Sequence, residues 1–210
     1  MSTTLYLVRN AATACAVERK LLGRLDQPLN DVGRQQLAVL SERFARIEIT
    51  DVIASPLLRT LDTAQAIAAP HGLGVARDVR LIDVELGSWE GRSIDEVERT
   101  KEYEQFRVQP LARIVPDVES LAEVRTRVLA SIEQILADSE LGAKIVVVTH
   151  SVPIRLAVAH FLGMDPADFY RLRISPASIS VVRWEETRPS VFSLNHTAHL
   201  GDIYDAEEIQ

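Results

Sequence analysis

The sequence predicts an α/β protein, a three-layer α/β/α sandwich with a mainly parallel central sheet. Short apolar stretches of strand type alternate along the chain with longer stretches of helical spacing, which is the pattern of βαβ units. The run from Lys144 to Thr149 is almost entirely apolar, as a strand buried on both faces of a parallel sheet is. Hydrophobic content of 47% and charged content of 25% are those of an ordinary globular protein.

The first half of the chain carries clear boundary signals. Asn30 has the residue type and position of an N-cap, because apolar residues follow it at helical spacing. Ser55 is expected to cap a second helix, with Pro56 in its first turn. The expected elements are a strand over 5–8 that stops at Arg9, a helix from Asn30 to about Arg46, a strand over 51–54 and a helix from Ser55 through Ile67.

The second half continues the alternation after an irregular stretch. Residues 83–118 show no long period, so we expect an insertion of loops and short helices over the carboxyl edge of the sheet. The other expected elements are a strand over 75–81, a helix from Glu119 to about Ala137, a strand over 144–149 that ends at His150, a helix over 153–162 and a closing strand pair over 179–184 and 190–194.

Composition and length limit the domain organisation and the binding partners that the sequence allows. No internal repeat, low-complexity segment or linker divides the sequence, so we expect a single domain over residues 1–210. The formal net charge of −7 argues against nucleic acid and anionic membrane as partners. A single cysteine excludes an internal disulfide, and no signal-type segment or apolar run of about 18 residues is present, so a cytoplasmic location is expected.

Three charged side chains follow strand ends in this reading. Arg9 follows the first strand, Arg59 lies near the start of the helix after the second, and His150 follows the central strand. Strand ends of a parallel sheet converge on one edge, where ligands bind in open α/β folds. Two arginines and a helix N-terminus near Ser55 therefore predict a pocket for a phosphate group.

The chain resembles the histidine phosphatase superfamily, the group that contains phosphoglycerate mutases and their phosphatase relatives. The resemblance runs from about residue 3 to residue 200, with the motifs in the family's order and spacing. The matching stretches are Leu7-Val8-Arg9; Gly23-Arg24-Leu25-Asp26 with Pro28-Leu29; Gly33 and Gln36; Ser55-Pro56-Leu57 with Arg59 and Thr63-Ala64; Glu85 with Gly87 and Trp89-Glu90-Gly91; Glu119-Ser120; and Thr149-His150-Ser151.

The resemblance implies a specific mechanism that needs no metal and no cofactor. In the family, a histidine directly after the first arginine attacks phosphorus, two arginines and a second histidine hold the phosphoryl oxygens, and a glutamate protonates the leaving oxygen. Phosphoryl transfer depends mainly on such positioning and charge stabilisation. By position, Arg9, Arg59 and His150 match the phosphate ligands. Glu85 matches the acid, and Arg24 is expected either at the rim of the phosphate site or paired with Asp26.

The sequence departs from the family at the nucleophile. The family's loop reads Arg-His-Gly-Glu-Thr, whereas this chain reads Arg9-Asn10-Ala11-Ala12-Thr13. Asn10 stands in the nucleophile's position, and a carboxamide nitrogen, with its lone pair delocalised, cannot do the work of an imidazole. Ala12 removes a carboxylate, and Ala16 replaces a phosphate-binding asparagine that many members carry.

Three functions follow from this departure. The leading hypothesis is a phosphatase-branch relative that binds a small phosphorylated metabolite or inorganic phosphate with weak or absent phosphatase activity, a pseudoenzyme with a binding or regulatory role. The rival is a working phosphomonoesterase in which water or His150 replaces the missing nucleophile. The third is an active parent phosphatase whose nucleophile has been replaced. A homodimer and a regulatory protein partner both stay open.

Two further candidates for chemistry have weaker support. Cys15 is a potential nucleophile, but cysteine phosphatases need a Cys-x5-Arg loop and Leu21 occupies that offset, so a structural thiol is expected. His196 and His199, near Asp202, have the spacing of a metal pair without the surrounding motif of a zinc site. We expect these histidines to serve packing or the surface.

Overall fold

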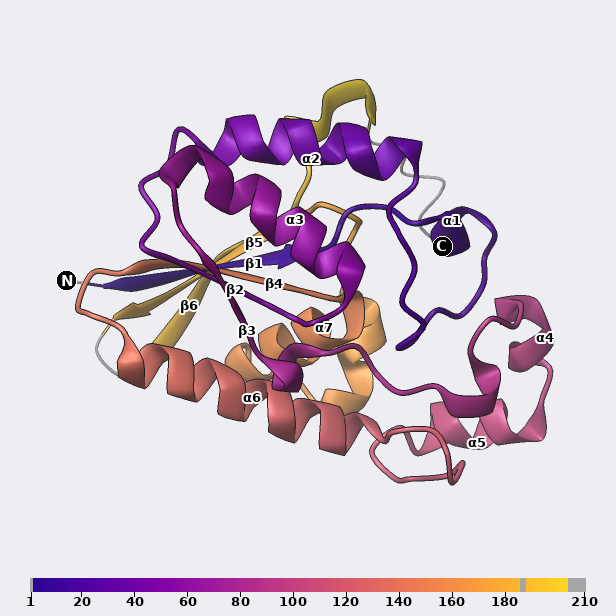
Figure 1. Ribbon diagram of the computed structural model, residues 1–210. Helices are drawn as coiled ribbons and strands as arrows, with labels where there is room; N and C mark the ends of the chain where they lie inside the picture. Colours follow the sequence, from indigo (N-terminus) through magenta and orange to yellow (C-terminus); the bar gives the residue numbers. More distant parts are fainter. Residues whose placement is uncertain (1, 186–187, 204–210) are drawn as a thin grey trace.

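The computed structural model describes residues 2–185 and 188–203. Within these residues, six strands form one sheet in the order β3-β2-β4-β1-β5-β6 (Figure 1). The pairs β3–β2, β2–β4 and β4–β1 are parallel, and β5 pairs antiparallel with both β1 and β6. The expected α/β class with a mainly parallel sheet is confirmed. The strands are β1 (Thr3–Arg9), β2 (Asp51–Ala54), β3 (Val75–Arg77), β4 (Lys144–Thr149), β5 (Ile179–Glu185) and β6 (Arg188–His196).

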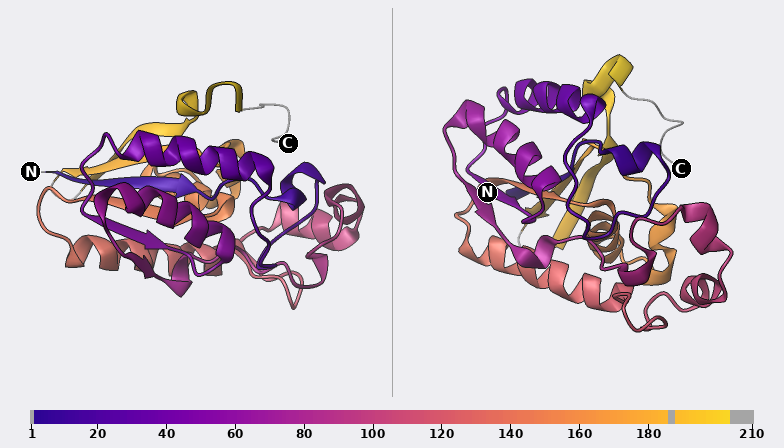
Figure 2. Two further views of the ribbon diagram at one scale, coloured as in Figure 1. Left: turned by 45° about the horizontal axis from the view of Figure 1, so that its top comes forward. Right: turned by 45° about the vertical axis from the view of Figure 1, so that its right-hand side comes forward.

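Helices flank the sheet. α2 (Asp31–Phe44) and α3 (Leu58–Ala68) lie over one face, while α6 (Leu121–Asp138) and α7 (Ser151–Phe161) lie over the other (Figures 1 and 2). No described helix is long and apolar enough to span a membrane. The remaining helices are α1 (Ala14–Val17), α4 (Ile94–Glu98) and α5 (Lys101–Val108), with 3-10 turns at Ala69–His71, Val79–Leu81, Gly87–Trp89, Pro166–Arg171 and Ala198–Ile203.

Alternate residues of β4 face two apolar clusters, one on each side of the sheet. Ile145 and Val147 pack with residues of α6 and α7, and Val146 and Val148 pack with residues of α2 and α3. All four side chains are buried. Both faces of the central strand are therefore covered, which explains its continuous apolar run.

The third strand is shorter than the sequence predicts. The expected strand runs to residue 81, but β3 ends at Arg77. The Asp78 carboxylate accepts a hydrogen bond from the backbone N–H of Arg80 at 2.8 Å and starts the 3-10 turn Val79–Leu81. The local competition of an aspartate side chain for the backbone ends the strand.

The expected cap of the helix after β2 is wrong. α3 begins at Leu58, so Ser55 and Pro56 both lie before it. The Leu58 N–H donates to Asp26 Oδ1 at 2.8 Å, so a loop distant in sequence caps the helix and occupies an N-terminal amide. Ser55 Oγ instead lies 2.8 Å from Nε2 of His150.

The insertion expected over residues 83–118 contains α4, α5 and the turn Gly87–Trp89. It lies beyond the carboxyl ends of the parallel strands (Figure 1). Its own apolar cluster is built on Trp89, whose ring packs edge-on against Phe106 with centroids 5.8 Å apart. This cluster gives the insertion a fixed shape beside the sheet edge.

Candidate active site

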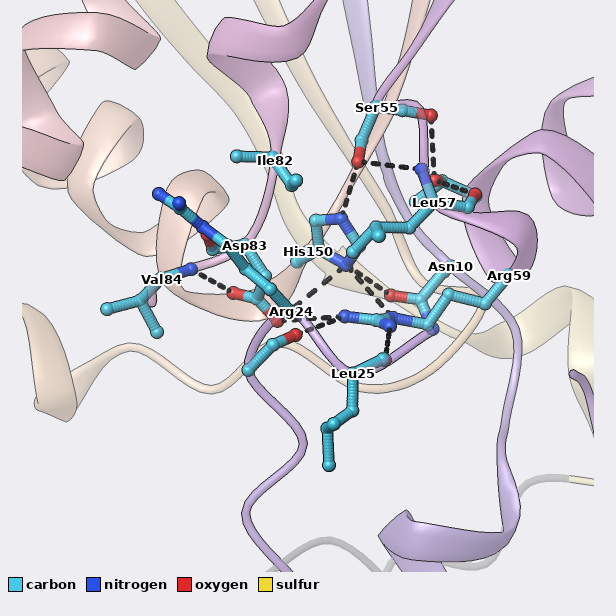
Figure 3. Close-up of polar contacts among 12 residues, drawn as sticks. Asn10, Arg24, Leu25, Ser55, Leu57, Arg59, Ile82, Asp83, Val84 and His150 are labelled. Carbon is cyan, nitrogen blue, oxygen red and sulfur yellow. Dashed lines mark hydrogen bonds and ion pairs between the residues drawn. The ribbon is translucent and has the colours of Figure 1, made fainter. Parts of the chain in front are cut away.

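Three neighbouring strands end side by side and deliver the central side chains. Ser55, His150 and Asn10 are the first residues after β2, β4 and β1 (Figure 3). The Ser55 N–H donates to the Val148 carbonyl at 3.0 Å, and the Asn10 N–H donates to the Thr149 carbonyl at 2.9 Å. The parallel register therefore continues one residue beyond the strands and fixes these side chains at one edge.

His150 is the centre of the polar contacts. Its Nε2 lies 2.8 Å from Ser55 Oγ, and its Nδ1 lies 3.2 Å from Asn10 Oδ1, 3.3 Å from Arg59 Nε and 3.7 Å from Asp83 Oδ2. Burial, reinforced by neighbouring arginines, holds the pKa of His150 well below its usual value. The ring is therefore neutral at physiological pH. Because Arg59 Nε is a donor and Asn10 Oδ1 an acceptor, Nδ1 can satisfy only one of them.

Arg59 is 1% exposed and is held by the loop that precedes α2. Its guanidinium donates to the carbonyls of Gly23 (2.6 Å) and Leu25 (2.8 Å), in addition to its contacts with His150 and Asp83. Burial lowers the pKa of Arg59, and the nearby carboxylate of Asp83 opposes that shift. The side chain that the sequence predicts as a phosphate ligand thus also ties the glycine-containing loop to α3.

A cavity of about 280 Å³ lies beside these residues. Arg9 and Arg59 both contribute to its lining, as the predicted convergence of strand ends requires. Burial, and then the charge of Arg155, lowers the pKa of Arg9 to about 10, so this guanidinium stays charged at neutral pH. The lining residues are Arg9, Asn10, Ala11, Ala12, Thr13, Lys20, Leu21, Leu22, Gly23, Arg59, Asp83, Val84, Leu86, Ile94, Ser151, Val152, Arg155 and Pro176.

The carboxylate that reaches this cavity is Asp83, which the sequence did not single out. Asp83 Oδ2 lies 3.4 Å from the Arg59 guanidinium, and burial raises the pKa of Asp83 against the opposing charge of Arg59 (Figure 3). Glu85 is absent from the cavity lining among the described residues, and its carboxylate pairs with Arg24 at 3.3 Å. Asp83 and Glu85 both precede Gly87 in one short stretch. Motif spacing alone therefore did not show which of the two lines the cavity.

A bracket of three charged side chains, Arg24, Glu119 and Arg127, holds the backbone around Asp83. Arg127 pairs with Glu119 through contacts of 2.8 and 2.9 Å and donates to the Asp83 carbonyl at 3.0 Å. Arg24 donates to the same carbonyl at 3.3 Å and pairs with Glu119 at 3.1 Å. Arg24, expected either at the phosphate rim or paired with Asp26, lies instead in this bracket and outside the described cavity lining.

The loop after β1 is held by residues of α2 and α3. The Ala11 N–H donates to Thr63 Oγ1 at 3.1 Å, and the Ala12 N–H donates to Gln36 Oε1 at 2.9 Å. A Cβ on Gly33 would lie 2.2 Å from the Ala12 carbonyl oxygen, so only glycine permits this approach. Gly33, Gln36 and Thr63, which match the family's motifs, therefore fix the backbone of the loop that lines the cavity.

The other candidates lie apart from the cavity lining. Cys15 is buried, and its Sγ lies 3.0 Å from Gln27 Oε1. The side chain of Ala16 is outside the described part of the structure. The rings of His196 and His199 stack with their centroids 5.8 Å apart. Among the described residues, no cluster of three or more His, Cys, Asp or Glu side chains could hold a metal ion.

Known proteins resemble this chain in sequence and in fold. Residues 5–197 match the profile of the "Histidine phosphatase superfamily (branch 1)". The chain is 32% identical over 202 residues to "Phosphoserine phosphatase 1" of Hydrogenobacter thermophilus, with 95% of each protein covered. It is 33% identical over 214 residues to "Probable phosphoglycerate mutase GpmB" of Yersinia enterocolitica, with 98% of each covered. The solved structure of Bacillus stearothermophilus YhfR superposes with a TM-score of 0.86 at 25% identity, over 94% of this chain and 99% of that one.

Proposed function

This chain belongs to the histidine phosphatase superfamily, and we propose that it binds a small phosphomonoester or inorganic phosphate in the cavity beside Asn10, with impaired phosphatase chemistry. Its role is then that of a binding or regulatory protein. Relatives named as a phosphoserine phosphatase and a probable phosphoglycerate mutase support a small phosphorylated metabolite as the ligand. Helix pairs on opposite faces of the sheet support a three-layer α/β/α arrangement around this site.

Asn10 is the observation that carries the proposal. Asn10 lines the cavity and directly follows Arg9, at the position where the family's nucleophile is expected. Its Nδ2 donates to the Ala11 carbonyl at 2.8 Å, and its Oδ1 faces His150 Nδ1. A carboxamide held in this way has no basic nitrogen lone pair with which to attack phosphorus.

The binding roles fall to the remaining charged groups. Arg9 and Arg59 supply guanidinium donors for the phosphoryl oxygens, and His150 supplies a neutral ring beside them. Asp83 replaces Glu85 in our assignment of the proton donor, because Asp83 lines the cavity and burial raises its pKa. A carboxyl group that keeps its proton closer to neutral pH is the better general acid.

A second candidate function is phosphomonoester hydrolysis by direct attack of water. The cavity placement of Asp83 favours it, since a carboxylate there can activate water or protonate a leaving oxygen. His150 is a poor replacement nucleophile, because both of its ring nitrogens face protein groups. The two functions predict different rates for the unaltered protein.

The test is to restore the imidazole with Asn10→His. We expect the unaltered protein to turn over p-nitrophenyl phosphate slowly and without an acid-labile phosphoenzyme. Binding and electrostatics alone retained about 10³–10⁴-fold acceleration in another hydrolase stripped of its catalytic residues, so some activity is allowed. Asn10→His should raise the rate by orders of magnitude and give a phosphohistidine that radiolabelled substrate traps.

Two control variants accompany that experiment. Asn10→Gln keeps the carboxamide and should give no gain. Calorimetric binding of inorganic phosphate should weaken about 10- to 150-fold in Arg9→Ala, the loss expected for a charged hydrogen bond of about 1.5–3 kcal/mol. An unaltered protein that hydrolyses phosphoesters at roughly 1–10³ per second refutes impairment and supports the second candidate. Unchanged phosphate affinity in Arg9→Ala refutes the binding site.

A further inference from the structure

The guanidinium of Arg9 is held in place by the loop of residues 174–178, which leads into β5. Its Nη1 donates to the Ile174 carbonyl, and this is the one hydrogen bond of the guanidinium among the described contacts. The Arg9 N–H donates to the Ser178 carbonyl of the same loop at 3.2 Å. The loop also donates to the chain after β1, from the Ala177 N–H to the Asn10 carbonyl at 3.2 Å. The position of this loop therefore decides where the charge of Arg9 lies in the cavity.

Asn195 of β6 holds the other side of the peptide that Arg9 contacts. Its Oδ1 accepts a hydrogen bond from the Ser175 N–H at 2.6 Å, and its Nδ2 donates to Ser175 Oγ at 3.2 Å. The Ile174 carbonyl and the Ser175 N–H belong to one planar, trans peptide unit, so they point in opposite directions. A side chain that fixes the direction of this N–H therefore also fixes the direction of the carbonyl that holds Arg9.

A β-bulge brings Asn195 to this peptide. Leu194 and Asn195 of β6 together lie opposite Ser180 alone on β5, so β6 has one extra residue here. Asn195 has a φ of 52°, in the left-handed region that asparagine tolerates better than most residues. Its N–H donates to Ser180 Oγ at 3.1 Å, which fixes the bulge. Bulges of this kind direct a side chain beside functional sites.

The peptide has little freedom to find another position without Asn195. Ile174, Ser175 and Ala177 are all buried. Enclosed backbone groups need hydrogen-bond partners, because water cannot replace a partner that is lost. Loss of the Asn195 oxygen costs the Ser175 N–H such a partner, so we expect the peptide to turn and the Ile174 carbonyl to move with it.

We propose that Asn195 is a positioning residue for the phosphate site, and that it acts on Arg9 through the peptide between Ile174 and Ser175. This inference rests on the proposed binding of phosphate by Arg9. Asn195 is absent from the cavity lining among the described residues, so its effect is indirect. A guanidinium already held in the binding direction loses less freedom when the phosphate arrives, which favours affinity.

The test is calorimetric binding of inorganic phosphate to Asn195→Gly. Glycine adopts the left-handed backbone freely, so this variant removes the side-chain hydrogen bonds without adding backbone strain. We expect phosphate affinity to fall about 2- to 12-fold, the range that corresponds to one ordinary hydrogen bond. In an Arg9→Ala background the same change should cause no further loss, because the effect of Asn195 passes through Arg9.

A control variant and a second measurement separate positioning from a folding defect. Ile145→Val weakens the buried core at the other end of β4 and should keep the affinity of the unaltered protein. If Asn195→Gly fails to fold, NMR of Arg9→Ala decides the question. Removal of Arg9 should shift the backbone amide signal of Ser175 and the side-chain amide signal of Asn195, because linked hydrogen bonds polarise one another.

The outcomes distinguish this inference from the proposed function. Unchanged affinity in Asn195→Gly, beside a loss in Arg9→Ala, overturns the positioning role and leaves the proposed function standing. An equal loss in both backgrounds, or an equal loss in Ile145→Val, shows that the effect does not pass through Arg9 and also overturns it. Unchanged Ser175 and Asn195 signals in Arg9→Ala have the same meaning. Absence of phosphate binding by the unaltered protein refutes the proposed function and this inference together.

Discussion

Two residues apart in the chain, Asp83 and Glu85 carry the same functional group into different surroundings. Asp83 is enclosed beside Arg59 and His150, and burial raises its pKa. Glu85 is 49% exposed at the side chain and pairs with Arg24. A raised pKa and a place beside the cavity are the two properties that a general acid needs, and Asp83 has both.

Replacement of Asp83 should be more damaging than replacement of Glu85. In an Asn10→His background, Asp83→Asn should lower the hydrolysis rate of alkyl phosphates by about 10²–10⁴-fold, the usual contribution of a general acid. The loss should be smaller for p-nitrophenyl phosphate, whose leaving group needs little protonation. Steady-state rates with both substrates provide the measurement.

Glu85→Gln is the matched control and should stay within a few-fold of its parent. A large loss in Glu85→Gln with little loss in Asp83→Asn would return the acid role to Glu85. Carboxyl titration by NMR in the unaltered protein gives an independent check, because Asp83 should titrate above its ordinary 3.8.

The first turn of α2 supports the loop after β1 through a very close approach. Gly33 donates its N–H to Asn30 Oδ1 at 2.7 Å, which confirms Asn30 as the predicted N-cap. The same glycine faces the Ala12 carbonyl, and the Ala12 N–H is held by Gln36 farther along the helix. One helix terminus therefore positions the backbone on which Asn10 sits.

Gly33→Ala should disturb both stability and binding. The new Cβ would lie 2.2 Å from the backbone oxygen of Ala12, so the loop or the helix must shift. Overpacking of this kind costs about 1–3 kcal/mol of the free energy of unfolding, and phosphate affinity should fall with it. Gly74→Ala is the control, since a Cβ there meets nothing within 4 Å. Equal melting temperatures and phosphate affinities for the two variants would show that the close approach of Gly33 to the Ala12 carbonyl does not constrain the loop.

The whole molecule is acidic, yet its cavity is cationic. The formal net charge is −7, while the cavity lining contains Arg9, Lys20, Arg59 and Arg155 against the carboxylate of Asp83. The anion binding that we propose therefore depends on the local arrangement of charges and not on the overall charge.

Burial of His150 links the site to the pH dependence of folding. The folded protein resists protonation of this ring, whereas the unfolded chain accepts a proton near the ordinary pKa of 6.5. As pH falls below that value, the unfolded state gains a proton that the folded state does not bind. Stability should then fall by up to about 1.4 kcal/mol per pH unit from this group.

His150→Gln should remove that part of the slope. Urea unfolding between about pH 5 and pH 8 should give a flatter decline for the variant than for the unaltered protein, whatever its stability at neutral pH. His160→Gln, at an exposed position, should keep the original slope. Parallel curves for His150→Gln and the unaltered protein would mean that the buried ring does not resist protonation.

The sequence by itself determined the sheet and the residues at its edge. Apolar runs and helical spacing predicted the alternation of strands and helices. Because parallel strands end at one edge, Arg9, Arg59 and His150 were predicted to lie there together. The prediction that Asn10 stands where the family's histidine is expected likewise comes from the chain alone. Such features depend on local periodicity and on the identity of single residues.

Tertiary structure alone decided which charged side chains enter the cavity. Asp83 and Glu85 lie in an irregular stretch whose direction is fixed by Arg24, Glu119 and Arg127, residues from distant parts of the chain. Periodicity orients side chains in helices and strands, but in a loop their direction depends on the groups that hold the backbone.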